Sequence, residues 1–399
     1  MTSTAAGHAD REDYRLGQGE GPLRGLKVVE IAGIGPGPHA CMTLADLGAD
    51  VIRIERPGHQ SFGGGAPSLL TRGRPSVALD LKKREAVETL LWLVERADVL
   101  IEGMRPGVAE RIGIGPETCH GRNPKLIYGR MTGWGQDGPW AHAAGHDVNY
   151  IAITGTLHGL GQVPQKPQFP SNLLGDFGGG ATYLVIGVLA ALLEARVSGS
   201  GQVVDAAIID GTAHLNTMTA GFAASGVYRE ERAANLLDGG APFYDVYETA
   251  DGEHMSVGAL EPQFYEQFVE LLGIKDAAPD RRDTSTYGEL RSIIAARFKE
   301  RTREEWCAVF GGTDACVAPV LRLSEAAQHP QMSARDVFVE HQGLVQPWPA
   351  PRFSRTAAKL GLPPAPTVGA DTRAGLTAWG VENVDDLIKR GVAAQEGEE

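Results

Sequence analysis

The chain has 399 residues, of which 42% are hydrophobic and 22% charged, so it is long enough for two or three domains with buried cores. Its formal net charge of -13 at pH 7 argues against a surface that coats nucleic acid, because such a surface needs clustered Lys and Arg, but it leaves room for a small anionic ligand. The four cysteines form no C-x-x-C pair and the eleven histidines show no metal-ligand spacing, so neither a disulfide framework nor a metal site is expected.

The first 22 residues are polar and lack the apolar segment of a signal peptide, so residues 1–22 are expected to be a disordered lead-in. The longest apolar run, ATYLVIGVLAALLEA, is shorter than the roughly 18 residues that a membrane span needs. The acidic C-terminus carries no peroxisomal or retention signal. Together with the scarce cysteines, these features predict a cytoplasmic protein with no membrane partner.

From Lys27 onward, short β-branched segments alternate with amphipathic ones. Strands are expected at KVVEI, DVIRIE, DVLIEG, PKLIYGRMTG and QVVDAAIID. Helices are expected at HACMTLADLG, at LKKREAVETLLWLVERA and over the long apolar segment after Asp176. This alternation predicts an α/β domain, with right-handed crossovers and a mostly parallel sheet covered by helices.

Near Asp238 the pattern changes to that of an α+β unit, which extends to about Leu321. The segment DGGAPFYDVYETADGEHMSVGAL predicts antiparallel strands that turn at ADGE, and EPQFYEQFVELLG and LRSIIAARFKERTREEWCAVF predict helices. The Pro-rich segment QPWPAPRFSRTAAKLGLPPAP predicts an extended connection. One amphipathic helix is expected near TRAGLTAWGVENVDDLIKRG.

The loop GIGPGP after the first strand has glycines at Gly33, Gly35 and Gly37, which resembles a dinucleotide-binding fingerprint. Pro38 stands where the third fingerprint glycine belongs, which argues against a nicotinamide cofactor. The sequence contains no G-x-S-x-G, no G-x-x-x-x-G-K-[ST] and no H-E-x-x-H motif. A tight loop at the carboxyl end of a parallel strand remains, and ligands bind at that edge of such sheets.

Basic side chains follow the successive predicted strands of the first domain. Each is ordinarily a solvated surface charge, but together they suit a phosphate-bearing ligand. They are Arg56, Arg72, Arg74, Lys82, Arg105 and Arg111.

Three acid or base side chains stand in unusual contexts, and each has an ordinary structural explanation. Asp176, in NLLGDFGGG, is either a helix N-cap or a catalytic acid. His146, in AGHDVNY, is either a structural histidine or a base, and Glu261, in ALEPQFY, suits the first turn of a helix. Burial would raise the pKa of Asp176 and a helix N-terminus would lower it, and the sequence leaves the outcome open.

Several stretches, taken together and in order, resemble the alpha-methylacyl-CoA racemases of the family III CoA-transferase superfamily. The resemblance extends from about Leu23 to Arg355 and is carried by VVEIAGIGPGPHA, RIERP, IEGMRPGV, GHDVNY, NLLGDFGGG, GAPFYDVYETADG, VGALEPQFY and TDACVAPVL. It implies a large Rossmann-like domain formed from both ends of the chain, residues 23–225 and 340–399, and a small α+β domain over 226–339. It also implies an interlocked homodimer.

The same resemblance implies epimerisation of R and S 2-methylacyl-CoA thioesters with no metal or redox cofactor, CoA being part of the substrate. His146 and Asp176 would be the two bases, Glu261 would hydrogen-bond His146, and Asn172 and Tyr244 would support Asp176. The positions that match CoA-contacting segments are Arg56, Leu79, Asp80, Leu81, Lys82, Arg105, Arg111, Gly145, His146, Asp147, Val148, Asn149 and Tyr150.

Two alternatives remain open. In a family III CoA-transferase, Asp176 would instead attack a thioester and form a mixed anhydride; that chemistry needs no histidine base, so His146 with Glu261 favours the racemase. A non-catalytic acyl-CoA-binding protein would have no reason to retain all three side chains. The loop from Gly159 to Pro170 is close in sequence to the expected site, and the acyl group is not fixed by the sequence.

Overall fold

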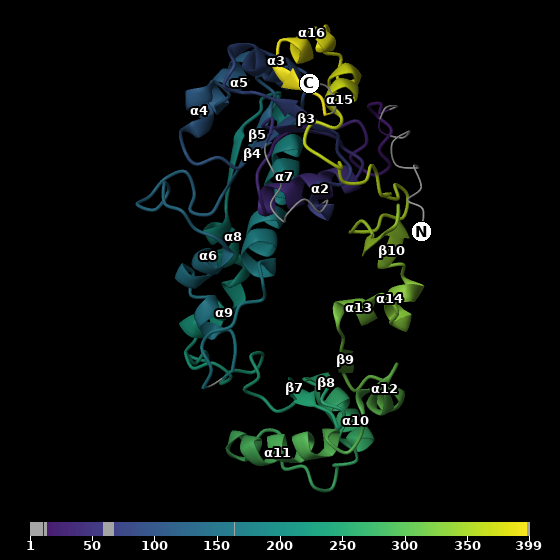
Figure 1. Ribbon diagram of the computed structural model, residues 1–399. Coiled ribbons are helices and arrows are strands. Elements are labelled where there is room, and N and C mark those ends of the chain that lie inside the picture. Colours follow the sequence, from purple (N-terminus) through teal and green to yellow (C-terminus); the bar gives the residue numbers. More distant parts are fainter. Residues whose placement is uncertain (1–10, 12–13, 59–67, 163, 397–399) are drawn as a thin grey trace. The chain divides into compact units, whose positions relative to one another are not determined.

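The computed structural model describes residues 11, 14–58, 68–162 and 164–396 (Figure 1). The chain divides into two compact units. Unit 1 consists of residues 1–154, 170–215 and 335–399, and unit 2 of residues 155–169 and 216–334. The chain passes from one unit to the other four times, so each unit is discontinuous in sequence.

Unit 1 is built on a seven-stranded sheet with the order β12-β3-β2-β1-β4-β5-β6. Strands β1 to β6 are parallel, and the short β12 pairs antiparallel with β3. Their bounds are β1 Lys27–Ile31, β2 Asp50–Glu55, β3 Ser76–Leu79, β4 Val99–Glu102, β5 Ile127–Thr132, β6 Val203–Ala207 and β12 Ala393–Ala394. The strand order reverses between β1 and β4, which is where doubly wound sheets bind their ligands.

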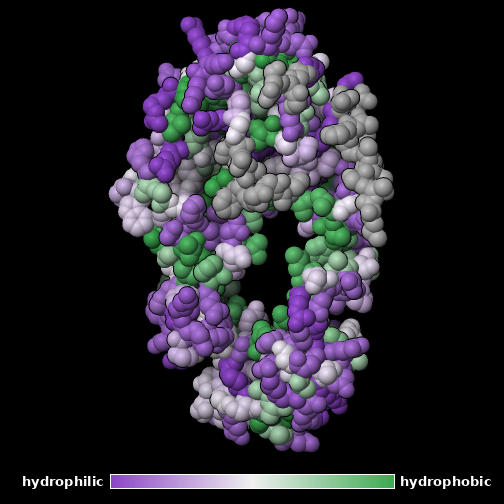
Figure 2. Space-filling model, viewed as in Figure 1, coloured by the Kyte–Doolittle hydropathy of each residue, from purple (hydrophilic) through white to green (hydrophobic). Residues whose placement is uncertain are grey.

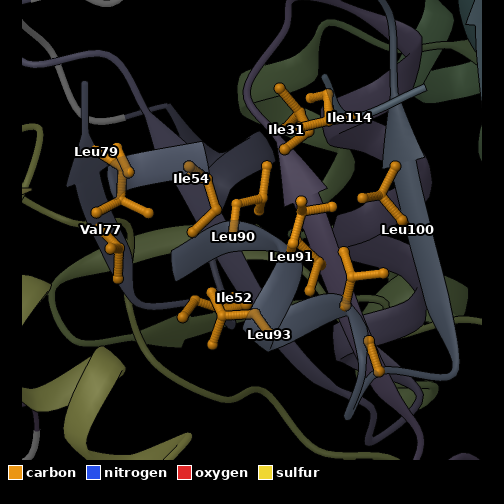
Figure 3. Packing of buried hydrophobic residues seen from close by; sticks show 14 of the residues in the cluster. Ile31, Ile52, Ile54, Val77, Leu79, Leu90, Leu91, Leu93, Leu100 and Ile114 are labelled. Carbon is orange, nitrogen blue, oxygen red and sulfur yellow. The ribbon is translucent and has the colours of Figure 1, made fainter. Parts of the chain in front are cut away.

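Helices cover both faces of this sheet because successive strand residues point to opposite faces. Val28 belongs to one buried cluster and its neighbour Val29 to the other. Figure 3 shows Ile52, Ile54, Val77 and Leu79 of the strands together with Leu90, Leu91 and Leu93 of α3. The helices of unit 1 are α2 Pro36–Asp46, α3 Arg84–Val94, α4 Val108–Ile112, α5 Pro116–Arg122, α6 Asp147–Ile153, α7 Thr182–Ser198, α8 Ile208–Leu215, α15 Thr372–Ala378 and α16 Val384–Lys389.

The C-terminal segment completes the sheet of unit 1. Helix α15 contacts β3, and β12 adds to the same edge, where Figure 1 shows the yellow end of the chain. The single helix expected there is two helices, because the chain turns between Trp379 and Asn383. Residues 348–371 form neither helix nor strand, as expected for the Pro-rich connection, and follow the hairpin of β10 Phe338–His341 and β11 Leu344–Pro347.

Part of the expected disordered lead-in is held against unit 1. Arg11 forms a buried ion pair with Asp371 at 2.6 Å, and the Gly17 amide donates to Asp50 at 2.8 Å. At these positions buried carboxylates supply partners that the local sequence does not reveal, and disorder of residues 1–22 stays a prediction. Residues 1–10 and 12–13 lie outside the described residues.

The apolar segment around α7 is longer than the sequence suggested. The π-helix η3, Leu173–Ala181, runs directly into α7, and the resulting 26-residue helix contains a window of mean hydropathy 1.6, which meets the length and composition criteria for a membrane span. The expectation that no apolar run is long enough is thus corrected. Leu184, Val188 and Ala191 are buried against the sheet, and 39% of that window is buried in the protein.

Unit 2 is the smaller α+β unit. Its sheet has the order β7-β8-β9 and is antiparallel, with β7 Tyr244–Glu248 and β8 His254–Gly258 turning at ADGE as expected, and β9 Val317–Val320. An aromatic core of Phe268, Phe298, Trp306 and Phe310 joins the helices to this sheet. The helices are α9 Thr217–Ala224, α10 Pro262–Leu272, α11 Tyr287–Phe298, α12 Arg303–Phe310, α13 Leu323–Ala326 and α14 Pro330–Ala334.

The observed unit boundaries lie close to the expected ones. The sequence placed the small domain at 226–339, whereas the longer segment of unit 2 extends from Asn216 to Ala334. Residues 155–169 also belong to unit 2, where Asn216 donates to Thr156 at 2.7 Å and Arg232 donates to the Gln165 carbonyl at 2.9 Å. The mostly parallel sheet and the separate antiparallel unit are as predicted; the interlocked dimer stays a prediction.

Candidate active site

A cavity of about 690 Å³ lies in unit 1 at the carboxyl ends of β1, β4 and β5. Ile31, Ile101 and Met131 from the ends of these strands form part of its wall. This is the edge at which the strand order reverses, so the cavity occupies the usual ligand position of a doubly wound sheet.

The glycine loop between β1 and α2 forms another wall of this cavity. Gly35 has a φ of +64°, and a Cβ placed on it would lie 3.0 Å from the Asp176 Oδ2 atom. A residue with a side chain would therefore meet both backbone strain and a steric conflict at this position. Glycine here permits the backbone to approach the carboxylate closely.

Asp176 lines the cavity from the π-helix η3. The cap position of this helix is occupied by Asn172, so Asp176 is not the N-cap that its local sequence suggested. The Asn172 Nδ2 atom donates to Asp176 Oδ2 at 3.1 Å. Short π-helical segments are frequent at functional sites, and this one presents a half-buried carboxylate to the cavity.

The pKa of Asp176 is raised above the usual aspartate value, chiefly because the carboxyl is partly buried. The Asn172 hydrogen bond lowers it, the negative charge of Asp147 raises it and His146 lowers it. Burial thus outweighs the stabilising hydrogen bond, and the carboxyl holds its proton to a higher pH than a solvated aspartate.

His146 lines the same cavity from the start of α6. Its side chain is exposed, and its backbone N–H donates to the Asn149 Oδ1 atom at 3.1 Å. Tyr150, one turn later, donates its hydroxyl to the Gly145 carbonyl and packs edge-on against Trp134 with ring centroids 4.6 Å apart. The structure therefore brings His146 and Asp176, which are 30 positions apart, to one cavity.

Other residues that the sequence singled out have different environments. Arg105, Gly145, Tyr150 and Asn172 line the cavity with the two candidate bases. Arg56, Lys82, Arg111, Val148 and Asn149 are exposed, and Asp80 and Leu81 are partly buried; none of these lines this cavity. Leu79 is fully buried in the core.

Arg72 and Arg74 are not available to bind a phosphate, which corrects one expectation. Arg72 pairs with Asp46 at 2.6 Å, and Arg74 pairs with Glu30 at 2.9 Å; both guanidinium groups are buried. Their charges are neutralised within the protein by acidic residues distant in sequence.

Buried ion pairs behind the cavity were missed by the sequence reasoning. Glu30 joins Arg53 as well as Arg74, and Arg53 also pairs with Glu55 at 3.1 Å. Glu102 pairs with Arg130 at 3.1 Å and accepts the Met104 amide at 2.6 Å, which fixes the segment that carries Arg105. The available signal was a charged residue within each otherwise apolar strand.

Glu261 and Tyr244 belong to unit 2. Glu261 is exposed at the cap position of α10, and Tyr244 begins β7. Tyr244 lines a second cavity of about 520 Å³, together with Gly159, Gln162 and Cys316. The start of the Gly159 to Pro170 loop thus lies beside Tyr244, while the hydrogen bond between His146 and Glu261 stays a prediction.

Within the described part of the chain, no group of three or more His, Cys, Asp or Glu side chains is placed to hold a metal ion. The candidate site accordingly consists of a histidine, a carboxyl of raised pKa, and backbone and basic groups at the mouth of a parallel sheet.

Comparison with known proteins identifies the family. Residues 23–372 match CoA-transferase family III. The chain is 44% identical over 367 residues to the alpha-methylacyl-CoA racemase of Mus musculus, covering 92% of this chain and 95% of that protein. It is 42% identical over 360 residues to the alpha-methylacyl-CoA racemase of Homo sapiens, covering 90% and 93%. The crystal structure of a CAIB/BAIF family protein from Brucella suis superposes on this chain with a TM-score of 0.78 and is 28% identical in sequence. The match covers 90% of this chain and 100% of the Brucella suis chain. The chain is a homologue of the alpha-methylacyl-CoA racemases and belongs to CoA-transferase family III.

Proposed function

We propose that this protein interconverts the R and S epimers of 2-methylacyl-CoA thioesters. The observation that carries the proposal is that His146 and a carboxyl of raised pKa, Asp176, line one cavity at the carboxyl ends of the sheet. The 42 to 44% identity to two racemases over most of the chain supports it.

The reaction requires two acid/base groups. One removes the proton from carbon 2, leaving an enolate of the thioester, and the other returns a proton to the opposite face, so atoms and charge balance without a redox partner. His146 is suited to remove the proton from carbon 2, because a neutral imidazole accepts a proton on its free ring nitrogen. Asp176 holds its proton more strongly than a solvated aspartate, which suits it to donate one to the enolate.

The enolate oxygen needs hydrogen-bond donors where its negative charge develops. Helix α2 begins at Pro36, beside Gly35, and its N-terminus carries no side-chain cap. We propose that backbone amides of this loop and of the glycine-rich π-helix face that oxygen, and that Arg105, at the rim, contacts the CoA phosphates.

We also propose that the protein works as a homodimer in which Glu261 orients the imidazole of His146. Large apolar side chains are exposed on unit 1 at Ile186, Leu193 and Val197 of α7 and at Val203 of the edge strand β6, and Figure 2 shows apolar residues reaching the surface. A second copy would cover such a surface. Light scattering on the purified chain should give twice the chain mass, and Leu193→Asp should shift it towards the monomer; a monomeric wild-type chain would refute the dimer.

The test of the activity uses a 2-methylacyl-CoA of either configuration in deuterated water. We expect deuterium at carbon 2 and loss of optical purity without any added carboxylic acid. His146→Ala and Asp176→Asn should each reduce the rate by at least about 100-fold while CoA binding, measured by calorimetry, persists. Transfer of CoA to an added acid, with little label at carbon 2, would instead establish the transferase alternative.

A further inference from the structure

Asp147 connects the backbones of the two candidate bases. It follows His146 directly in the chain, and its Oδ2 atom accepts the Asp176 amide N–H at 2.7 Å. The Gly175 amide also donates to this carboxylate. A Cβ on Gly175 would lie 2.4 Å from Asp147 Oδ2, so the carboxylate lies directly against the π-helix backbone.

The burial of Asp147 is compensated only in part, by the two backbone N–H groups. The residue is 6% exposed, and its Oδ1 atom has no hydrogen-bond partner among the described residues. No described cation acts on its carboxylate. Such a carboxylate destabilises a fold unless its position serves another purpose. The buried acids Glu30, Asp46 and Glu102 are each paired with an arginine, whereas no ion pair within the described part of the chain is formed by Asp147 or by Asp50.

We infer that Asp147 is a positioning residue of the proposed racemase, whose carboxylate ties the segment of His146 to the backbone of Asp176 and places a negative charge near the Asp176 carboxyl. The inference rests on the proposed function. The hydrogen bond fixes the carboxyl relative to the histidine segment, and the charge, which raises the pKa of Asp176, helps to keep a proton available for the enolate.

Other titratable groups surround the π-helix. Asp147 and His146 act electrostatically on the Asp176 carboxyl, and Asp176 in turn raises the pKa of Tyr150, on which Arg105 acts in the opposite sense. Helices α2, α7 and α8, which also contact the π-helix, contribute His39, Tyr183, Asp210 and His214. Among all these groups, Asp147 is the one that both raises the pKa of Asp176 and bonds its backbone.

Two substitutions separate the hydrogen bond from the charge. Asp147→Asn keeps a carbonyl oxygen for the Asp176 amide but removes the charge, and Asp147→Ala removes both. Asp50→Asn is the control. Asp50 is about as buried as Asp147, at 5% exposure, and accepts one backbone N–H, from Gly17. It begins β2, so it lies at the end of the strand away from the cavity. Rates are measured across pH with the R and with the S substrate.

For Asp147→Asn we expect kcat to fall about tenfold, KM to change by less than about threefold, and the pH limb due to Asp176 to move to lower pH by up to about one unit. Removing a neighbouring negative charge lowers the pKa of Asp176. In the direction of epimerisation in which Asp176 donates the proton, the variant should therefore lose activity at a lower pH than the wild-type chain. In the direction in which Asp176 accepts the proton, the variant should gain activity at a lower pH than the wild-type chain. Asp147→Ala should lose more, and Asp50→Asn should keep the wild-type profile. A limb that stays in place in Asp147→Asn would overturn the inference.

A second measurement requires no substrate. Infrared spectra of the wild-type chain and of Asp147→Asn, labelled with ¹³C-carboxyl aspartate and each compared with its matching Asp176→Asn variant, report the protonation of Asp176 across pH. A carboxylic-acid band that is lost at a lower pH in Asp147→Asn than in the wild-type chain supports the inference, and one lost at the same pH in both refutes it. If the wild-type chain incorporates no deuterium into substrate, the proposed function fails, while this titration still reports on Asp147 and Asp176.

Discussion

Gly35→Ala tests whether the close approach of the glycine loop to Asp176 is required. Gly35 has a φ of +64° and a ψ of −115°, a sparsely populated backbone conformation that costs a non-glycine residue of order 1–3 kcal/mol. In addition, the new Cβ would lie 3.0 Å from Asp176 Oδ2, which is tighter than nearly all such contacts, so the carboxylate would shift by a few tenths of an ångström. We expect a loss of about 1–3 kcal/mol in the free energy of unfolding and a fall of about tenfold in kcat, because small displacements of a catalytic group are costly.

The matched control is Gly37→Ala, two residues along the same loop. A Cβ on Gly37 would meet no atom within 4 Å, and its backbone is not in the left-handed region. Because Gly37 lies in the first turn of α2, alanine should leave stability unchanged or slightly increased. Denaturant unfolding and the rate of deuterium incorporation are measured for both variants. If Gly35→Ala is as stable and as active as Gly37→Ala, the proposed role of this close approach is wrong.

Two further predictions concern buried charge. Glu30→Gln should lower the free energy of unfolding, measured by urea titration, by about 3–5 kcal/mol, because it leaves the Arg53 and Arg74 charges buried without their shared partner. The control is Glu88→Gln, which breaks an exposed pair with Arg122 and should change the free energy of unfolding little. Asp176→Asn should stabilise the protein at pH 7 but not at pH 3. The raised pKa means that the folded state holds this proton more strongly, so stability is lost as pH rises from the usual aspartate pKa through the raised value, and the asparagine variant escapes that loss. An equal difference in unfolding free energy at both pH values would contradict the assigned shift.

The alternating strands and helices of unit 1 were predictable because each has a local signature. Buried runs such as Val28 to Ile31 and helical spacing such as that of Leu90 and Val94 depend on neighbours in the sequence. The assignment of residues 155–169 to unit 2 was not predictable, since it depends on contacts of Thr156 with Asn216, 60 positions away.

The environments of the basic residues also depend on contacts that are distant in sequence. Arg72, Arg74 and Arg105 all follow predicted strands, and nothing local distinguishes them. The structure separates them, because Arg72 and Arg74 meet buried acids while Arg105 lines the cavity. A charge within an apolar strand, as at Glu30, was the signal that such partners existed.

The opposing influences on the pKa of Asp176 are decided by where the helix begins, which is before Asp176 in the chain. At an N-cap, the carboxylate would accept backbone N–H groups, and these would lower its pKa. Because the π-helix begins at Leu173, Asp176 lies within it, and its own amide is bound by Asp147. The donor that the described residues offer to the carboxylate is the Asn172 side chain at 3.1 Å, which does not offset burial. The position of Asp176 within the helix, and not at its cap, thus leaves burial to raise the pKa of the carboxyl, which is the direction that the proposed proton transfer needs.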